Sequence, residues 1–143
     1  MCLITRQKEP EILSRDIRTF KVLKVEDGVP PCAIHQTFWY ELNQLYETDI
    51  VESELPAPYD SKVTEFYVLD ASSYNAIRRN LKEYDLIALG KGFHSFANRK
   101  RAAGEIWRTN YELFECLIPA GSEIFYDETG LCVSNKIKIL KQI

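Results

Sequence analysis

Stretches that alternate apolar and polar side chains, or that gather β-branched and aromatic residues, predict β-strands over much of this chain. In the C-terminal third, the strict alternation of Lys136-Ile137-Lys138-Ile139 predicts a strand with one buried and one solvated face. Asp127-Glu128-Thr129-Gly130 separates two apolar runs and predicts a hairpin turn that needs its glycine. The strands predicted in this third are residues 111–118, 124–126, 131–133 and 136–139.

The same pattern predicts strands in the N-terminal part, with turn residues at the breaks. Residues 20–25 form the first clear strand, which ends at the turn dipeptide Asp27-Gly28. Pro30 and Pro31 then interrupt the chain, because proline has no N–H to donate to a strand ladder. Residues 1–15 are polar and mixed, so we expect either a loosely attached arm or a short edge element. Two further predicted strands are residues 64–69 and 86–89.

Two helices are predicted between the strands. Side-chain oxygens at residues 70–73 can cap exposed N–H groups, which predicts a helix over residues 74–84 with Ile77, Leu81 and Tyr84 on one face. Asn98 predicts the cap of a second helix that runs through Trp107. Residues 33–46 are dense in aromatic side chains, and periodicity does not decide between helix and strand there.

Runs of strands with two inserted helices, without regular strand–helix–strand alternation, predict an α+β fold rather than a doubly wound sheet. The length of 143 residues fits one domain spanning residues 1–143. We therefore expect a single α+β domain with a mainly antiparallel, curved sheet and two or so helices.

Charge and composition exclude several classes of protein. The formal net charge of −3, with both signs interspersed, argues against a dedicated nucleic-acid binder. The apolar runs are only a few residues long, so no membrane span is predicted. The first residues lack the apolar region of a signal peptide, and we expect a cytoplasmic protein with reduced thiols.

The cysteines indicate no metal site, because they form no CxxC pair and neither histidine lies at ligand spacing from them. Cys116 and Cys132 lie in predicted strands, where cysteine serves as a small buried apolar group. Cys2 carries a separate hypothesis: removal of Met1 would expose a thiol beside a free α-amine, as in N-terminal nucleophile hydrolases. The remaining cysteine is Cys32, and the two histidines are His35 and His94.

The most unusual local sequence is Gly90-Lys91-Gly92-Phe93-His94-Ser95-Phe96. Its glycines permit a tight turn or a close approach of the backbone to a ligand. His94 and Ser95 are adjacent, so in a strand they point to opposite faces and do not form a nucleophile–base pair. The structural alternative is that His94 is a partly buried, hydrogen-bonded histidine and the glycines serve the turn. The candidate ligand-binding residues are Gly92, Phe93, His94, Ser95 and Phe96.

Three other side-chain groups have a functional and a structural interpretation each. The cations near the second helix can meet a phosphate or an acidic partner, or form a solvated face. The aromatic residues around Phe38 can form a stacking platform or a core. The acidic stretch from Glu47 to Glu54 can mimic nucleic-acid charge or form a solvated loop. The basic patch consists of Arg99, Lys100, Arg101 and Arg108, and the aromatic group of Phe38, Trp39, Tyr40, Tyr46 and Tyr59.

Beyond the Gly-Phe-His-Ser segment come a helix with Ala102 and Ala103, a strand leading into Ile118-Pro119-Ala120-Gly121-Ser122, a hairpin and a closing strand. This order resembles the C-terminal half of ADP-ribosyltransferase-like domains. The chain is also similar to small uncharacterised proteins of phages and gut Bacteroidales that share a GFHSF…IPxGS…VSNKI pattern. That second resemblance spans most of the chain and implies no established activity.

The ADP-ribosyltransferase-like resemblance implies a Ser-Thr-Ser strand at the nicotinamide pocket, and only Ser95 matches it here. It also implies an arginine or histidine on the opening strand, where this chain offers Lys21 and Lys24. The catalytic glutamate has no counterpart in residues 131–136, although Glu123 and Glu128 lie nearby. Without that carboxylate, NAD chemistry would lose its main electrostatic stabilisation.

We therefore expect a non-enzymatic or degenerate-site accessory protein of a phage or mobile element, which binds a host protein or a small nucleotide-like ligand and needs no cofactor. Residues 92–96 and the adjacent helical residues 99–101 would form the binding site. The alternative is an NAD-dependent ADP-ribosyltransferase-like enzyme, with Ser95 and His94 on the nicotinamide side and Glu123 as acid. The third hypothesis is the Cys2 hydrolase.

Overall fold

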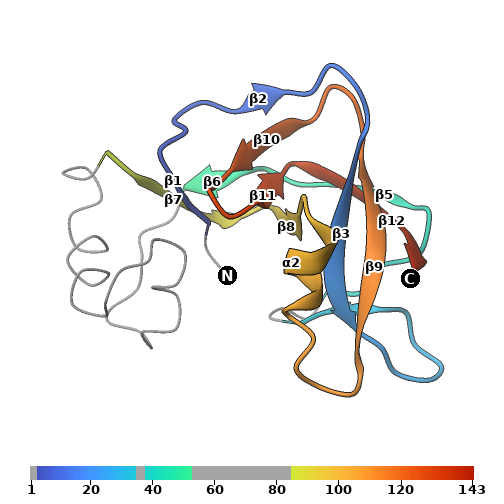
Figure 1. The fold of residues 1–143 in the computed structure, drawn as a ribbon. Coiled ribbons are helices and arrows are strands. Elements are labelled where there is room, and N and C mark those ends of the chain that lie inside the picture. Colours follow the sequence, from blue (N-terminus) through green and yellow to red (C-terminus); the bar gives the residue numbers. More distant parts are fainter. Residues whose placement is uncertain (1–2, 35–37, 53–84) are drawn as a thin grey trace.

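The computed structural model describes residues 3–34, 38–52 and 85–143 (Figure 1). The predicted helix over residues 74–84 and the predicted strand over residues 64–69 lie outside these residues. The described elements are β1 (Leu3–Thr5), β2 (Glu11–Ile12), β3 (Ile17–Lys24), β4 (Cys32–Ala33), β5 (Leu45–Glu47), β6 (Val51–Glu52), β7 (Ile87–Lys91), β8 (Phe93–Phe96), α2 (Arg99–Ala103), β9 (Tyr111–Ile118), β10 (Glu123–Tyr126), β11 (Leu131–Ser134) and β12 (Lys136–Gln142).

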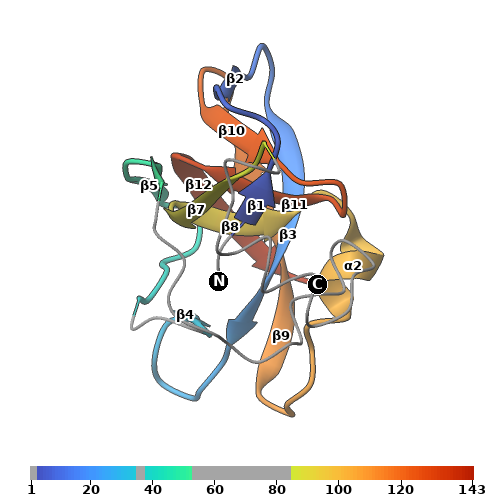
Figure 2. The same cartoon turned by 90° about the vertical axis from the view of Figure 1, so that its left-hand side faces the viewer.

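The strands form two antiparallel sheets, which confirms the predicted mainly antiparallel architecture. The larger sheet has nine strands in the order β2-β10-β11-β8-β3-β9-β12-β5, with β4 added beside β3. The smaller sheet has the order β1-β7-β6. Strands β8 and β3 meet through a single residue pair, Phe20 with Phe96, and β8 crosses β3 and β9 steeply in both views (Figures 1 and 2). The larger sheet therefore bends sharply at this junction.

The described part of the segment before β3 supplies an edge strand to each sheet. Leu3 is fully buried and pairs with Leu89 of β7, while β2 pairs with β10. Side chains add to this attachment: Thr5 Oγ1 donates to the Tyr126 carbonyl at 2.6 Å, and Gln7 Nε2 donates to the Ile124 carbonyl at 2.9 Å. These bonds satisfy backbone groups that an unpaired edge would leave exposed.

Helix α2 begins where the sequence predicts and ends earlier. Asn98 is its N-cap, and the Asn98 Oδ1 atom accepts a hydrogen bond from the Arg101 N–H at 3.1 Å. The helix ends at Ala103, whereas the prediction extended it through Trp107. Gly104 follows, with low helix propensity, and the next N–H groups bond three residues back in a tightened turn. Only Ala102 of this helix is buried, so packing does not prolong it.

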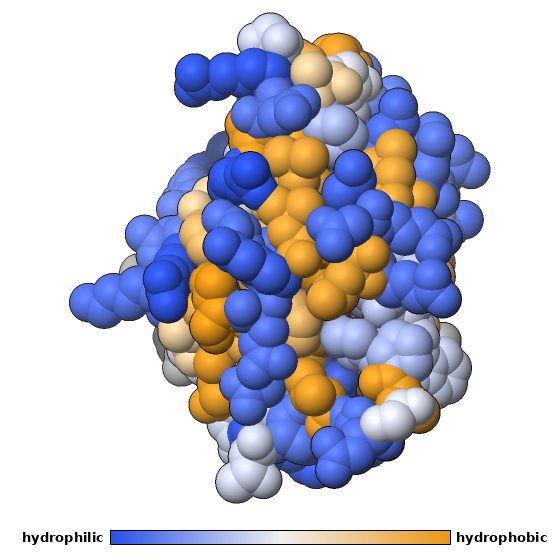
Figure 3. Space-filling model, turned by 90° about the vertical axis from the view of Figure 1, so that its right-hand side faces the viewer, coloured by the Kyte–Doolittle hydropathy of each residue, from blue (hydrophilic) through white to orange (hydrophobic). Residues whose placement is uncertain are grey.

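The core lies on both faces of the larger sheet. On one face, Leu3 and Leu89 of the smaller sheet pack with Val22, Leu113 and Val133. The other face holds a cluster of Leu23, Tyr40, Phe93, Phe114, Cys116, Ile137 and Ile139. The alternation of β12 is as predicted, with Ile137 and Ile139 fully buried. The outer face over β9 and β12 shows apolar strips between charged side chains (Figure 3).

Within the described residues, no helix is long and apolar enough to cross a membrane. Cys116 and Cys132 are both fully buried strand residues, as predicted. They are free thiols.

Candidate functional site

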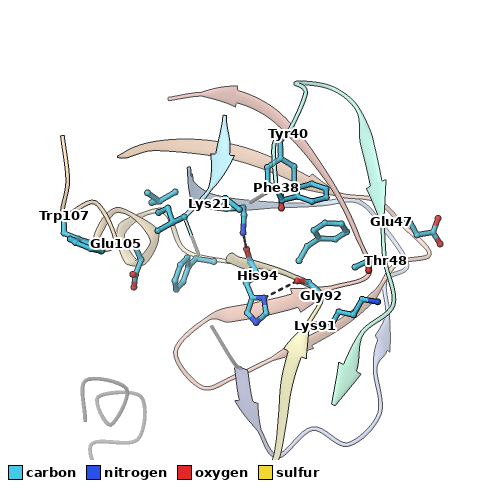
Figure 4. A pocket seen from close by; sticks show the side chains of 15 residues that line it. Lys21, Phe38, Tyr40, Glu47, Thr48, Lys91, Gly92, His94, Glu105 and Trp107 are labelled. Carbon is cyan, nitrogen blue, oxygen red and sulfur yellow. Dashed lines mark hydrogen bonds between the residues drawn. The ribbon is translucent and has the colours of Figure 1, made fainter. Parts of the chain in front are cut away.

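A pocket of about 270 Å³ opens beside β8, where four of the five candidate ligand-binding residues lie (Figure 4). Strand β3 supplies Lys21 and Val22, and residues 38–48 supply a further wall. We call this cavity the Lys21 pocket. Its lining consists of Lys21, Val22, Ala33, Ile34, Phe38, Tyr40, Glu47, Thr48, Lys91, Gly92, Phe93, His94, Phe96, Glu105 and Trp107.

His94 and Ser95 point to opposite faces of the sheet, as the sequence predicts for neighbours in a strand. His94 lies opposite Val133, and Ser95 lies opposite Cys132. Ser95 is almost fully buried, with its Oγ atom 3.4 Å from the Cys132 Sγ atom. Ser95 is therefore outside the pocket lining, unlike Gly92, Phe93, His94 and Phe96.

His94 is a partly buried, hydrogen-bonded histidine, which is the structural alternative considered for it. Its Nδ1 atom lies 3.2 Å from the Gly92 carbonyl, and because a carbonyl only accepts, Nδ1 carries the proton of this bond. In the described part of the chain, the buried Nε2 atom has no hydrogen-bond partner. Burial, with the neighbouring Lys21, lowers the pKa of His94 to about 3. The imidazole is thus neutral near pH 7 and poorly matched to general acid–base catalysis there.

Gly92 is required by packing. Its φ angle is +141°, a conformation that side chains rarely adopt, and a Cβ atom here would overlap Cγ1 of Val133. The glycine thus lets β8 lie against β11 without a clash. This supports the turn interpretation of the glycine at the entrance to β8.

Lys21 is the site residue that the sequence analysis did not select as a ligand-binding candidate. Its Nζ atom donates to the His94 carbonyl at 2.5 Å, and no ion pair joins it to a carboxylate in the described structure. Burial lowers the pKa of Lys21. The neighbouring thiols of Cys116 and Cys132 are neutral near pH 7, because burial raises their pKa values to about 12 and about 11. The resemblance pointed to Lys21 only together with Lys24, and the alternation did not separate the two, since β3 carries polar residues on both of its faces.

Aromatic rings form one wall of the pocket and part of the core at once. Phe38 packs edge-on against Tyr40 and Tyr46, with ring centroids 4.8 Å and 5.4 Å apart. Phe93 continues the group at 6.4 Å from Phe38. Trp39 points away from this wall and is 49% exposed. Phe38 and Tyr40 thus pack with the core and also line the pocket, while Tyr59 lies outside the described residues.

Two cations of the predicted basic patch contact neighbouring aromatic rings, and the other two are exposed on α2. Arg101 lies 3.6 Å from Glu105 and stacks over the Phe96 ring. Arg108 lies over the ring of Trp107 at 4.7 Å, and that tryptophan is 61% exposed. The two remaining cations, Arg99 and Lys100, are exposed on α2.

The residues proposed for NAD chemistry are not brought together. Glu123 begins β10, where its N–H donates to Asn135 Oδ1, and it is not part of the pocket lining. The carboxylates that do line the pocket are Glu47 and Glu105. In the part of the chain that the structure describes, no group of three His, Cys, Asp or Glu side chains could hold a metal ion. Cys2 lies outside that part.

Comparison with known proteins adds no assignment, since no protein-family model, curated protein or solved structure matches this chain.

Proposed function

We propose that this protein binds a small nucleotide-like ligand in the Lys21 pocket and does not transform it. The observation that carries the proposal is the pairing, in one cavity, of aromatic rings with a lysine amine that no carboxylate neutralises among the described residues. Ligand pockets typically combine apolar walls with a few placed polar groups. The resemblance to phage and gut Bacteroidales proteins supports a role as a cytoplasmic accessory protein of a phage or mobile element.

The pocket volume indicates the size of the ligand. About 270 Å³ is near the lower end of the range for small-molecule sites. A mononucleotide or a smaller ring-bearing anion suits such a volume better than an extended dinucleotide does. We therefore expect mononucleotides to bind more tightly than NAD.

The pocket lining offers contacts for both the base and the phosphate of such a ligand. The rings of Phe38 and Phe93 offer apolar contact for a base, and stacking of this kind contributes about 1–3 kcal/mol per base. The amine of Lys21 lies at the inner side, ready to donate to a phosphate oxygen. Lys91 is exposed at the rim and would attract the anion to the entrance.

The same geometry supports binding without chemistry. A neutral His94 with a pKa of about 3 is a weak base, and the buried thiols of Cys116 and Cys132 are un-ionised near pH 7. The alternative of an ADP-ribosyltransferase-like fold and enzyme needs His94, Ser95 and an acid at one ligand. It predicts NAD turnover that is lost in both His94→Ala and Ser95→Ala while the protein stays folded.

A thermal-shift series with AMP, ADP, cyclic AMP, ADP-ribose and NAD tests the proposal. A ligand at about 100 times its dissociation constant adds roughly 2.7 kcal/mol of stability, which is readily visible. We expect the largest shift with a mononucleotide, loss of the shift in Lys21→Met, and its retention in Lys24→Met. Lys24 is the matched control because it lies on the same strand and pairs with Glu26 outside the pocket. Absence of a shift with every ligand would overturn the proposal.

A second candidate function is capture of an acidic host protein by the surface of α2. It is favoured by the exposed Arg99 and Lys100 beside Trp107, since arginine and tryptophan are common at interface hot spots. The double change Arg99→Glu and Lys100→Glu would then abolish binding of the partner without altering the melting temperature. The same charge reversal at Lys136 and Lys138 on β12 is the control.

A further inference from the structure

Among the described residues, no carboxylate pairs with the Lys21 amine. From β8 it faces the His94 carbonyl and the neutral His94 imidazole; from β9 and β11 it faces the thiols of Cys116 and Cys132. The remaining titratable groups of the pocket lining are Tyr40, Glu47, Lys91 and Glu105.

None of these groups supplies the missing charge. Tyr40 is buried, and its burial raises the pKa of its phenol, so it stays neutral. Glu105 is paired with Arg101 at 3.6 Å, and Glu47 is an exposed residue of β5. Lys91 adds a second cation to the lining. An ammonium group in this place would therefore be desolvated without an opposite charge from these groups, which favours the uncharged amine.

We propose that the Lys21 pocket takes up an anionic ligand together with a proton, which Lys21 receives as the anion arrives. The inference rests on the function proposed above and names the ligand class more closely, as one that carries a phosphate or similar anion. The anion supplies the counter-charge that the pocket lacks, so the ammonium becomes stable in the complex. A neutral analogue would bind without this proton.

Proton uptake makes affinity depend on pH in a defined direction. At pH values between the pKa of Lys21 in the unliganded protein and its higher pKa in the complex, the binding of each anion takes up one proton from solution. Affinity for the anion therefore falls as pH rises through this interval, by up to tenfold per pH unit. Lys24 pairs with Glu26 and is not part of the pocket lining, so it does not contact the anion.

Isothermal titration calorimetry with AMP at a series of pH values from 7 to 10, in pairs of buffers with different ionisation enthalpies, measures the uptake. We expect the apparent binding enthalpy to differ between the buffers by an amount equivalent to up to one proton per AMP. Adenosine should show no difference. Lys21→Arg keeps a permanent charge and should bind AMP without a buffer-dependent enthalpy, whereas Lys24→Arg should behave like the parent protein.

Equal enthalpies in both buffers, with AMP bound, would overturn the inference and leave the proposed function standing. Failure of AMP and the other nucleotides to bind would overturn the proposed function. A second measurement does not depend on binding or on how Lys21→Arg folds: NMR titration of ¹³C-labelled lysine side chains in the unliganded protein. We expect the pKa of Lys21 to lie below the ordinary value for lysine, and an ordinary value would overturn the inference.

Discussion

The imidazole of His94 is neutral because it is buried, and this predicts an acid-sensitive fold. Its pKa is about 3 in the folded protein, against an ordinary value of 6.5. Between these values the unfolded chain binds a proton that the folded chain does not, so stability falls as pH falls. The slope approaches about 1.4 kcal/mol per pH unit. We expect a loss of about 2 kcal/mol between pH 6.5 and 5, measured by urea unfolding.

His94→Gln cannot take up this proton and should show a flatter profile over the same interval. The same substitution at the other histidine, His35, tests whether the slope belongs to His94. A profile unchanged by His94→Gln would show that the acid sensitivity comes from other groups. The interval above pH 5 is chosen because ordinary carboxylates titrate below it.

Gly92→Ala should destabilise the fold by about 2–5 kcal/mol, because backbone strain and overpacking act together. The added Cβ would overlap Val133, at a φ angle of +141°. Gly28→Ala is the matched control: its φ is also positive, but nothing lies within 4 Å of the added atom. Thermal unfolding of both variants, and of Gly92→Ala with Val133→Ala, separates the two causes. Equal losses at Gly28 and Gly92 would contradict the overlap.

At the residue scale, strand alternation predicted which way side chains point but not what meets them. It placed His94 and Ser95 on opposite faces and the cysteines in buried positions, since these depend only on local geometry. Lys21 was missed because its role depends on β8, far along the chain, bringing the His94 carbonyl to its amine.

Among the elements, helix α2 depends on its cap more than on packing. It spans only Arg99–Ala103 and buries one side chain, so the bond from the Arg101 N–H to Asn98 Oδ1 is a large part of its support. Asn98→Ala should cost about 1 kcal/mol, and Asn98→Asp should cost little because a carboxylate also caps. Chemical unfolding measures both. Equal stability of Asn98→Ala and the parent protein would contradict the role of the cap.

The strands could be predicted where turn residues flank a run of alternating or clustered apolar positions. β9 matches its predicted bounds, and β10, β11 and β12 match to within a few residues. The aromatic stretch beyond Ala33 was undecidable, because β4 and β5 are only two and three residues long and too short for periodicity to show. The end of α2 was missed because apolar Ile106 and Trp107 continue the pattern although both are exposed.

At the scale of the whole molecule, the smaller sheet is joined to the larger one through Leu3. This side chain is fully buried in the cluster shared by both sheets. Leu3→Ala should cost about 2–5 kcal/mol, as for other buried leucines, whereas Ile12→Ala on exposed β2 should cost less than about 1 kcal/mol. Urea unfolding compares the two. Similar small losses would mean that the N-terminal segment contributes little to the fold.

The pairing of β3 with β9 also determines when this protein can fold. β3 is complete at Lys24, yet the strand against which all eight of its residues pair begins only at Tyr111. At ordinary translation rates, roughly 5–20 s pass between the synthesis of β3 and the synthesis of β9. β1 waits similarly for β7, to which it pairs at Leu89. During this interval the two residues of β4 pair with only one end of β3, and β1 lacks its β7 partner, so both strands leave backbone groups open to pairing with other chains.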